Sequence, residues 1–471
     1  MIAFLRRFFK KIKVKIMAIY KTPGVYVEET SNAPLSVAEV ATAIPAFIGF
    51  TQIVPKTGPK VPVRITSMLE YEGLFGKAKP YAYDVKIVRD TNTAKPSITS
   101  IGKDAAAEKT IIYYALQLYF TNDGGPCYIV PLSDGDTHEE GLEAVASVDE
   151  VTLLVCPDAA TIHASSPQGG ASNPYYAICQ KALQQCADSK DRFAILDVLD
   201  TDLEAAEFRN EIGNENLKCG AAYLPYLKTN LSYGYDEPQV EVTIDQTKTQ
   251  TLAELSKDQP KIYRFVKTAL NNAPKVVLPP SAAIAGVYAR VDQNRGVWKA
   301  PANVSVIGIE GPTRKITDRE QASLNIDATA GKSINTIRAF TGKGTLVWGA
   351  RTLAGNDNEW RYVPVRRLFI TVEESIQKST SFAVFEPNDH PTWKKVENMV
   401  DSYLYGLWQQ GALAGSTPKQ AYFIKVGLNQ TMTAQDILDG RMIIEIGMAV
   451  VRPAEFMILR IVHNNGGAIE S

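Results

Sequence analysis

Three apolar runs decide the fold of this chain: Val151-Thr-Leu-Leu-Val-Cys156, Arg192-Phe-Ala-Ile-Leu-Asp-Val198 and Cys219-Gly-Ala-Ala-Tyr-Leu-Pro-Tyr-Leu227. Residues 174–188 and 202–213, which lie between them, have helical character. Strands that alternate with helices of about 10–15 residues are typical of an α/β layer with a mainly parallel sheet. We therefore expect a mixed α/β chain in which these runs are strands of one sheet.

Two more strands are predicted toward the N-terminus. The run Thr42–Phe50 is mostly apolar, which is typical of a buried strand. A helical segment at residues 105–120 precedes a second apolar run, Cys127–Leu132. The α/β layer should therefore extend over most of residues 105–228.

Three segments lack this periodicity. Residues 77–104 are polar and predict a loop or insertion. Residues 230–272 are also polar, but the alternating stretch Val240–Ile244 predicts an inserted hairpin followed by a helix. Residues 279–302 are rich in Pro, Gly and Ala and predict loops packed against a core.

Two capping pairs predict short helices. Thr66-Ser67 predicts a helix start, with Leu69 and Leu74 on the apolar side of the helix. Thr433 and Asp436 have the spacing of a capping box, in which each residue hydrogen-bonds the backbone of the other. We expect a short helix after each pair.

Two long helices are predicted in the C-terminal part, from the stripes Val365, Leu368, Phe369, Val372, Ile376 and Trp393, Val396, Val400, Tyr403, Leu404, Leu407. Pro391 suits the first turn of the second helix. Beyond them, Ile443–Val451 and Glu455–His463 are nearly continuous apolar segments separated by Pro453. Segments this apolar have to lie in a sheet, either their own or that of a neighbour.

The charge balance argues against a nucleic-acid-binding protein. The 471 residues include 50 Lys and Arg and 51 Asp and Glu, a net charge of −1. Six basic residues without any acid gather at the start: Arg6, Arg7, Lys10, Lys11, Lys13 and Lys15. This amphipathic segment is interpreted either as an interfacial membrane helix, or as an upstream start or a tail, with Met17 as the initiator. Membrane contact is expected only through residues 1–16, since no run of about 18 apolar residues occurs.

No motif has the spacing of a catalytic, cofactor or metal site. Gly331-Lys332-Ser333 resembles the end of a phosphate-binding loop, but Ile326 stands where that motif needs Gly. His138-Glu139-Glu140 begins like a zinc motif, but Leu142 stands where the second His is needed. The five Cys residues lack CxxC spacing and are expected to be reduced and mostly buried. We therefore expect no catalytic residue, cofactor or metal, and an assembly protein rather than an enzyme.

Four blocks of sequence resemble contractile tail sheath proteins, which form the outer sheath of contractile phage tails and of related bacterial injection particles. The first block is Tyr20-Lys-Thr-Pro-Gly-Val-Tyr-Val-Glu-Glu29. The others are Pro279–Asn303, Arg361–Ser375 and a set that runs from Phe385-Glu-Pro-Asn388 to Arg452-Pro-Ala-Glu-Phe456. The blocks occur in family order over residues 18–463, which makes the resemblance specific.

The resemblance implies a multi-domain subunit, with an inner domain built from N- and C-terminal parts, an inserted outer α/β domain and extended terminal β-arms. The expected division is a basic amphipathic extension or mis-assigned start (1–17), an N-terminal donor arm (18–36), the N-terminal part of an inner sheath domain with a loop (37–104), an outer α/β domain (105–335) with an insertion (230–272), a C-terminal inner sheath domain (336–440) and a C-terminal strand arm (441–471).

The resemblance also implies a mechanism. Sheath subunits stack as rings around a rigid inner tube, contract after a baseplate signal and drive the tube through a target envelope, while their arms add strands to the sheets of neighbours. The residues expected to take part in this strand exchange are Val25, Tyr26, Val27, Glu28, Phe456, Ile458 and Ile461. Lys394 and Lys395, on the polar face of the second long helix, are expected to contact acidic residues of the inner tube.

The implied partners are neighbouring copies of the chain, an inner tube protein, and baseplate and terminal cap proteins, with no nucleic acid. The particle would be assembled in the bacterial cytoplasm and then be extracellular or membrane-anchored. An injection system is preferred, because the chain is most similar to particles with a single sheath protein. The alternatives are the tail sheath of a phage or prophage, another filament or surface-layer protein, and an α/β enzyme of unknown type.

Overall fold

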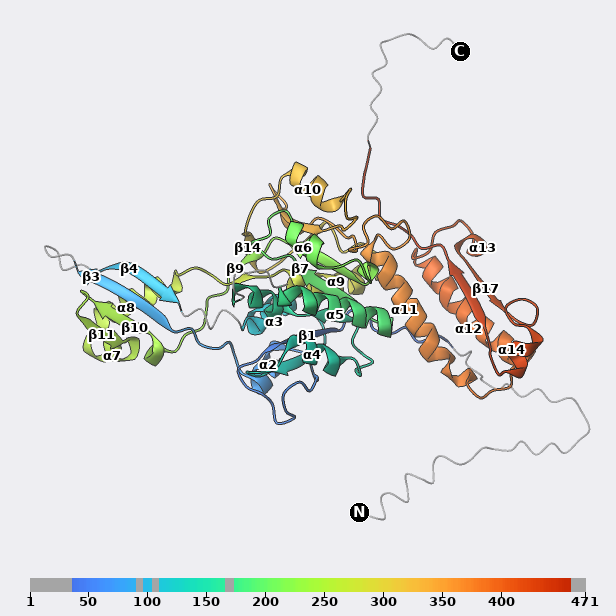
Figure 1. Cartoon of the computed structure of the whole chain (residues 1–471), viewed down its shortest axis with the longest axis horizontal. Helices are drawn as coiled ribbons and strands as arrows, with labels where there is room; N and C mark the ends of the chain where they lie inside the picture. The colour runs from blue at the N-terminus through green and yellow to red at the C-terminus, as the bar shows by residue number, and fades with distance from the viewer. Residues whose placement is uncertain (1–35, 90–95, 104–109, 166–172, 459–471) are drawn as a thin grey trace, which may run out of the picture. The chain divides into compact units, whose positions relative to one another are not determined.

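A computed structural model describes residues 36–89, 96–103, 110–165 and 173–458 of the chain (Figure 1). Its largest sheet has nine strands in the order β13-β16-β15-β8-β7-β6-β1-β5-β2. Their bounds are β1 (Pro45–Phe50), β2 (Val63–Ile65), β5 (Cys127–Leu132), β6 (Leu153–Val155), β7 (Phe193–Asp197), β8 (Gly220–Leu224), β13 (Val304–Ser305), β15 (Asn335–Phe340) and β16 (Gly344–Val347). The strands from β15 to β5 are parallel, and β13, β16 and β2 pair antiparallel. The predicted α/β layer is therefore confirmed.

Helices cover both faces of this sheet. One face carries α3 (Ile112–Thr121) and α9 (Ser281–Arg295), and the other carries α4 (His138–Val145), α5 (Pro174–Ser189) and α6 (Ala206–Glu211). Because successive strand residues point to opposite sides, Phe47 of β1 lies in the core under α3 and α9, and Ile48 lies in the core under α4 and α5. Burial on both faces is why these strands are continuous apolar runs in the sequence.

The helix α9 corrects the expectation that residues 279–302 are loops. Every residue from Ser281 to Tyr288 is buried. A Cβ atom on Gly286 would lie 2.6 Å from the backbone oxygen of Tyr119 in α3, so this contact leaves no room for a side chain. Ala is also the best helix-forming residue. The Ala and Gly content that suggested loops is therefore what close packing of two helices requires.

The short helix α2 (Met68–Phe75) begins as predicted, because Ser67 Oγ accepts the N–H of Glu70 at 3.3 Å. Its expected apolar side was wrong: Leu69 is 81% exposed, and Tyr71 and Phe75 are buried instead. Leu74 is also exposed, at 37%. The two aromatic rings, spaced i and i+4, lie 5.1 Å apart and together fill more of the core than the leucines would.

Residues 77–104 are not the loop that the sequence predicted. They contain β3 (Tyr83–Arg89) and β4 (Pro96–Lys103), which join β10 (Glu241–Ile244) and β11 (Lys248–Thr251) in a sheet of order β11-β10-β3-β4 (Figure 1). The predicted hairpin is therefore present, followed by two helices, α7 (Leu252–Asp258) and α8 (Pro260–Asn271). Tyr83, Val85 and Ile87 alternate with exposed residues along β3 and pack in the core of this unit. We call these four strands and two helices the small domain.

Shorter strands and helices lie in the segments between the elements described above. A three-stranded sheet has the order β12-β9-β14, with β9 (Leu227–Thr229), β12 (Val277–Leu278) and β14 (Ile309–Pro312), and α10 (Asp318–Asn325) follows β14. Short 3-10 helices are η3 (Pro157–Ser165), η4 (Leu217–Cys219), η5 (Glu237–Gln239) and η6 (Ser381–Ala383).

The C-terminal elements are α11 (Val363–Thr380), α12 (His390–Gln409), α13 (Pro418–Ala421), β17 (Tyr422–Val426), α14 (Ala434–Leu438) and β18 (Ile444–Met448). Both long helices confirm the predicted stripes, and Pro391 lies in the first turn of α12. The capping box of Thr433 and Asp436 is present at the start of α14. The apolar segment Ile443–Val451 forms β18, which pairs antiparallel with β17.

Strand pairing joins segments that the expected domain division separates. β1, from the part expected to be inner, lies between β5 and β6 of the part expected to be outer. β15 begins at Asn335, the last residue of the expected outer domain, and pairs with β8. The β3–β10 pairing likewise joins residues on the two sides of position 104.

Candidate functional site

The residues expected to exchange strands are partly described. Val25, Tyr26, Val27, Glu28 and Ile461 lie outside the described residues. Phe456 and Ile458 follow β18 in an extended segment, and their side chains are 66% and 79% exposed. The apolar side chains of this segment are thus accessible to another surface.

The C-terminal segment is held at Glu455, just before these exposed residues. Arg351 Nη2 donates to Oε2 of its carboxylate at 2.6 Å, and Arg351 Nε donates to Oε1 at 2.9 Å and to Oε2 at 3.2 Å. Asn325 Nδ2 donates to Oε1 at 2.7 Å, and Tyr362 OH donates to Oε2 at 3.1 Å. Burial alone would raise the pKa of Glu455, but these donors and the Arg351 charge hold the pKa below its ordinary value.

Arg351 is itself fixed to the nine-stranded sheet. Asn335 Oδ1 accepts its backbone N–H at 2.8 Å, and Asn335 Nδ2 donates to its backbone oxygen at 2.8 Å. Asn335 is fully buried at the start of β15. The C-terminal segment is therefore tied through one arginine to a central strand.

The N-terminal side of the described chain is held in a similar way along α11. Ser379 Oγ accepts the N–H of Ala38 and Ser375 Oγ accepts the N–H of Val40, both at 3.1 Å. Arg367 Nη2 donates to the backbone oxygen of Thr42 at 2.7 Å. Alternate residues, Ala38, Val40 and Thr42, thus bond to one face of α11.

The β17–β18 sheet has open edges. Neither strand has a second partner strand among the residues that the structure describes. One face of the sheet packs against α12, whereas Phe423 on the other face is 44% exposed. A Cβ atom on Gly447 would clash with the Phe423 ring, so the ring lies directly over this glycine. A two-stranded sheet with unpaired edges is a template for further strands.

Lys394 and Lys395 are exposed on α12, as the sequence predicted. Lys394 Nζ lies 2.7 Å from Glu397 Oε2, and Lys395 Nζ lies 4.5 Å from the centre of the Phe382 ring. Both ammonium groups therefore already have a neighbour within the chain, and both stay accessible to a partner.

The rejected motifs have structural roles. Lys332 is 3% exposed and donates to the backbone oxygen of Arg209, and Ser333 Oγ donates to that of Asn325 at 2.6 Å. His138 is buried against Phe50, and burial lowers its pKa to about 4. All five Cys residues are free thiols, and Cys156 is the one that is not fully buried. Burial raises the pKa of the Cys179 thiol to about 12, which makes it unreactive.

Two buried carboxylates near strand ends also hold helices. Asp158, after β6, accepts the N–H groups of Phe50 at 2.7 Å and Ile111 at 2.9 Å. Asp197, at the end of β7, accepts the N–H of Ser281 at 2.7 Å. Of these donors, Ile111 and Ser281 lie at the N-termini of α3 and α9, where a negative charge is favourable, whereas Phe50 ends β1. Burial raises the pKa of each carboxyl to about 7.

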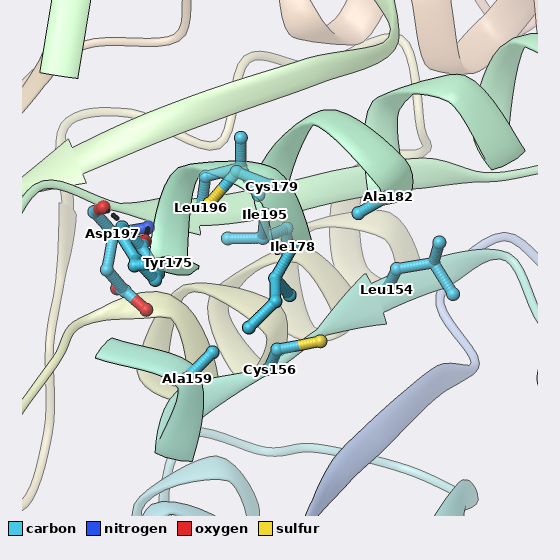
Figure 2. Close-up of a pocket in the computed structure, with 10 residues that line it drawn as sticks. All are labelled: Leu154, Cys156, Ala159, Tyr175, Ile178, Cys179, Ala182, Ile195, Leu196 and Asp197. Atoms are coloured by element: carbon cyan, nitrogen blue, oxygen red, sulfur yellow. Dashed lines mark hydrogen bonds between the residues drawn. The ribbon is translucent and has the colours of Figure 1, made fainter. Parts of the chain in front are cut away.

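The cavity beside Asp197 is too small for a substrate. Its volume is about 10 Å³, the space of a single water molecule. Figure 2 shows Tyr175 and Asp197 at one end and the thiols of Cys156 and Cys179 along it. Within the described residues, no group of three or more His, Cys, Asp or Glu side chains is placed to hold a metal ion. Nor is any helix there long and apolar enough to span a membrane.

Known proteins resemble this chain over nearly its whole length. The family model of the phage tail sheath protein central domain matches residues 180–353, and that of the phage tail sheath C-terminal domain matches residues 355–464. A chain in the solved baseplate of the anti-feeding prophage (AFP) is 35% identical, with a TM-score of 0.64, and the similarity covers 95% of this chain and 100% of that chain. This chain belongs to the phage tail sheath family.

Two further proteins are similar to this chain, one from an injection system and one from a phage. The sheath complex of an extracellular contractile injection system, PVC, in its contracted state is 32% identical with a TM-score of 0.62, over 95% of this chain and 99% of that chain. The tail sheath protein of Vibrio phage KVP40 is 26% identical over 177 residues, 38% of this chain and 25% of that protein. This chain thus spans about a quarter of that curated relative's length. The resemblance inferred from the four sequence blocks is confirmed.

Sequence reasoning missed the groups that hold the two ends of the described chain in this sheath protein. Arg351 and Ser379 lie outside the four blocks, and Ser375 ends one of them, but none was predicted to hold a chain end because each is an ordinary polar residue in its local sequence. Glu455 stood in a quoted block, and a single carboxylate at the start of an apolar segment was the available signal. Its partner Arg351 could not be identified, since the two lie 104 positions apart.

Proposed function

We propose that this chain is the sheath subunit of a phage-tail-like contractile injection particle. It polymerises as stacked rings around an inner tube and contracts to drive that tube through a target envelope. The observation that carries this proposal is full-length similarity to the AFP chain at 35% identity, compared with 26% over 38% of the chain for the phage relative. The same comparison favours an injection particle over a phage tail. Its role is structural, and catalysis has no part in it.

The proposed joints between subunits are the terminal arms and the β17–β18 sheet. A neighbour's residues 25–28 or 456–461 would add strands to the open edges of β17 and β18, as in β-augmentation. The exposed Phe456 and Ile458 and the open-edged sheet support this assignment. Donation from one subunit to the next is heterologous, which generates a filament rather than a closed pair.

We place the helices α11 and α12 at the inner wall of the sheath and the small domain on its outside. The exposed Lys394 and Lys395 of α12 would meet acidic residues of the tube protein. The small domain combines two segments outside the four family blocks, and insertions are best tolerated where nothing packs against them. Baseplate and cap proteins would bind the two ends of the sheath. Assembly would occur in the bacterial cytoplasm, before release or attachment to a membrane.

Electron microscopy of the purified protein, alone and with its tube protein, tests this function. We expect long striated tubes, and folded monomers without tubes once residues 18–33 are deleted, as judged by sedimentation and circular dichroism. Monodisperse small particles from the intact chain would contradict the proposal. A capsid gene beside the sheath and tube genes would favour the phage alternative.

A further inference from the structure

We propose that Glu455 fastens the C-terminal segment to the nine-stranded sheet, and that its ion pair with Arg351 transmits the pull between neighbouring subunits. This inference rests on the proposed sheath function. It makes Glu455 and Arg351 positioning residues, because they act through the segment that follows them and not by touching a neighbour themselves.

Glu455 is bonded to residues outside the C-terminal elements, α11 to β18, that precede it in the chain. After β18, Val451 N–H still bonds to Ala412 O at 3.2 Å, within the C-terminal elements. Glu455 then bonds to Asn325 at the end of α10 and to Arg351, both outside those elements. A pull on the segment therefore reaches the nine-stranded sheet before it reaches β17 and β18.

The ion pair differs from the surface pairs of the same chain. The side chain of Arg351 is 4% exposed and that of Glu455 is 20% exposed. By contrast, Lys425 and Glu445 on the β17–β18 sheet are 51% and 54% exposed and lie 3.6 Å apart. Exposed pairs contribute little because water screens them, whereas a buried two-point bond between guanidinium and carboxylate is strong and directional. The pair of Arg351 and Glu455 is therefore suited to resist a pulling force on the C-terminal segment.

Behind Arg351 the connection continues into rigid structure. Asn335 bonds to both backbone groups of Arg351 and is the first residue of β15. It pairs with Tyr223 of β8 in the centre of the sheet. Glu455, Arg351 and Asn335 thus form an unbroken series of hydrogen bonds from the segment to the buried start of β15.

Loss of the fastening would lengthen the free segment. Its last hydrogen-bonded point would move from Glu455 back to Val451. Four more extended residues add about 13–14 Å of slack, at about 3.3–3.6 Å per residue. A neighbour could then move by this distance before any force passed to the sheet.

The first experiment measures the fastening in the full-length, unassembled subunit. Chymotrypsin cuts after Phe456 once it has taken up the residues on both sides of the cut, and the hydrogen bonds of Glu455 hinder this even though the Phe456 side chain is exposed. Mass spectrometry identifies the released C-terminal peptide. We expect Glu455→Ala to speed this cleavage about tenfold or more. Glu455→Gln, which keeps an acceptor for Asn325 or Tyr362, should give an intermediate rate. The control Asp318→Ala removes a carboxylate that is 97% exposed and pairs with Arg338, and it should leave the rate unchanged. Equal rates in Glu455→Ala and the original chain would overturn the fastening.

The second experiment measures transmission, by imaging sheaths before and after a contraction stimulus such as mild denaturant. We expect Glu455→Ala to form fewer tubes, or tubes that contract incompletely, and Asp318→Ala to behave normally. Normal assembly and contraction of Glu455→Ala would overturn the load-bearing role, even if cleavage is faster. Failure of the unmodified chain to form tubes would instead contradict the sheath function, and the cleavage experiment would still test the fastening.

Discussion

Arg367 of α11 and Asp292 of α9 form a buried ion pair with two parallel hydrogen bonds, Nη1 to Oδ1 at 3.0 Å and Nη2 to Oδ2 at 2.5 Å. Their side chains are 3% and 6% exposed. The same guanidinium lies 4.6 Å from the centre of the Tyr288 ring and donates to the backbone oxygen of Thr42. One side chain therefore joins the C-terminal helices, the central core and the N-terminal side of the described chain.

Replacing Arg367 by Ala should strongly destabilise the fold, because Asp292 would remain as an unpaired buried charge. Breaking one partner of such a pair costs about 3–5 kcal/mol. Denaturant unfolding measures the loss. The double variant Arg367→Met with Asp292→Leu should recover much of it, since no charge is then left buried. A shift no larger than that of Asp318→Ala, which removes a carboxylate that is 97% exposed, would contradict this role of Arg367.

Reversing Lys394 and Lys395 to Glu should impair assembly on inner tubes and leave self-association of the sheath intact. The pairs proposed at this interface act by charge, so binding of the original chain to tubes should weaken at high salt. Co-sedimentation with purified tubes measures both effects. The matched control is Lys257→Glu with Lys261→Glu on the small domain, which makes the same change in net charge on exposed side chains. Equal loss of tube binding in both variants would indicate a general charge effect.

Replacing Phe385 by Gly should stabilise the isolated subunit. Phe385 is fully exposed and has a φ angle of 68°, a left-handed conformation that costs about 1–2 kcal/mol for a residue with a Cβ atom. Because Gly adopts this conformation without that cost, and no buried contact is lost, we expect a gain of about 1 kcal/mol in the free energy of unfolding. The neighbouring change Val384→Gly should not stabilise, since the φ angle of Val384 is −66°.

Asp158 and Asp197 should make the fold less stable as the pH rises from about 4 to about 7. Burial raises the pKa of each to about 7 in the folded chain, above an unfolded value near 3.8. The folded state therefore holds these protons more tightly, so their contribution is complete below the unfolded pKa and is lost as the pH passes the folded pKa. Urea midpoints at pH 5 and pH 8 measure the difference.

The matching variants are Asp158→Asn and Asp197→Asn, which remove the titrating group and keep one oxygen acceptor for a helix N-terminus. We expect each to reduce the change in midpoint between pH 5 and pH 8. Asp318→Asn, at an exposed position, should leave that change as it is. An unaltered pH dependence in both buried variants would show that other groups are responsible.

Features that depend on near neighbours in the chain could be predicted from the sequence. The runs at β5, β6 and β7 predicted strands of a mainly parallel sheet, and the run at β1 predicted a buried strand, because a strand covered on both faces needs apolar residues throughout. Ser67 and Thr433 marked helix starts, since a cap bonds to backbone only about three residues away. The stripes of α11 and α12 followed from helical periodicity. The four blocks, which occur in family order, indicated the sheath family.

Features that depend on distant partners were decided only by the tertiary structure. β3 pairs with β10, and its apolar side chains pack against those of α7 and α8. Because all three partners lie far along the chain, residues 77–104 were predicted to be a loop or insertion. The Gly and Ala of α9 indicated a helix only beside α3, because the need for small residues arises from the approach of another backbone. Likewise, Glu455 acts as a fastening only where the fold brings Arg351, Asn325 and Tyr362 around it. Hydrogen bonds between such distant residues leave no periodic trace in the sequence, since chain folding alone sets their geometry.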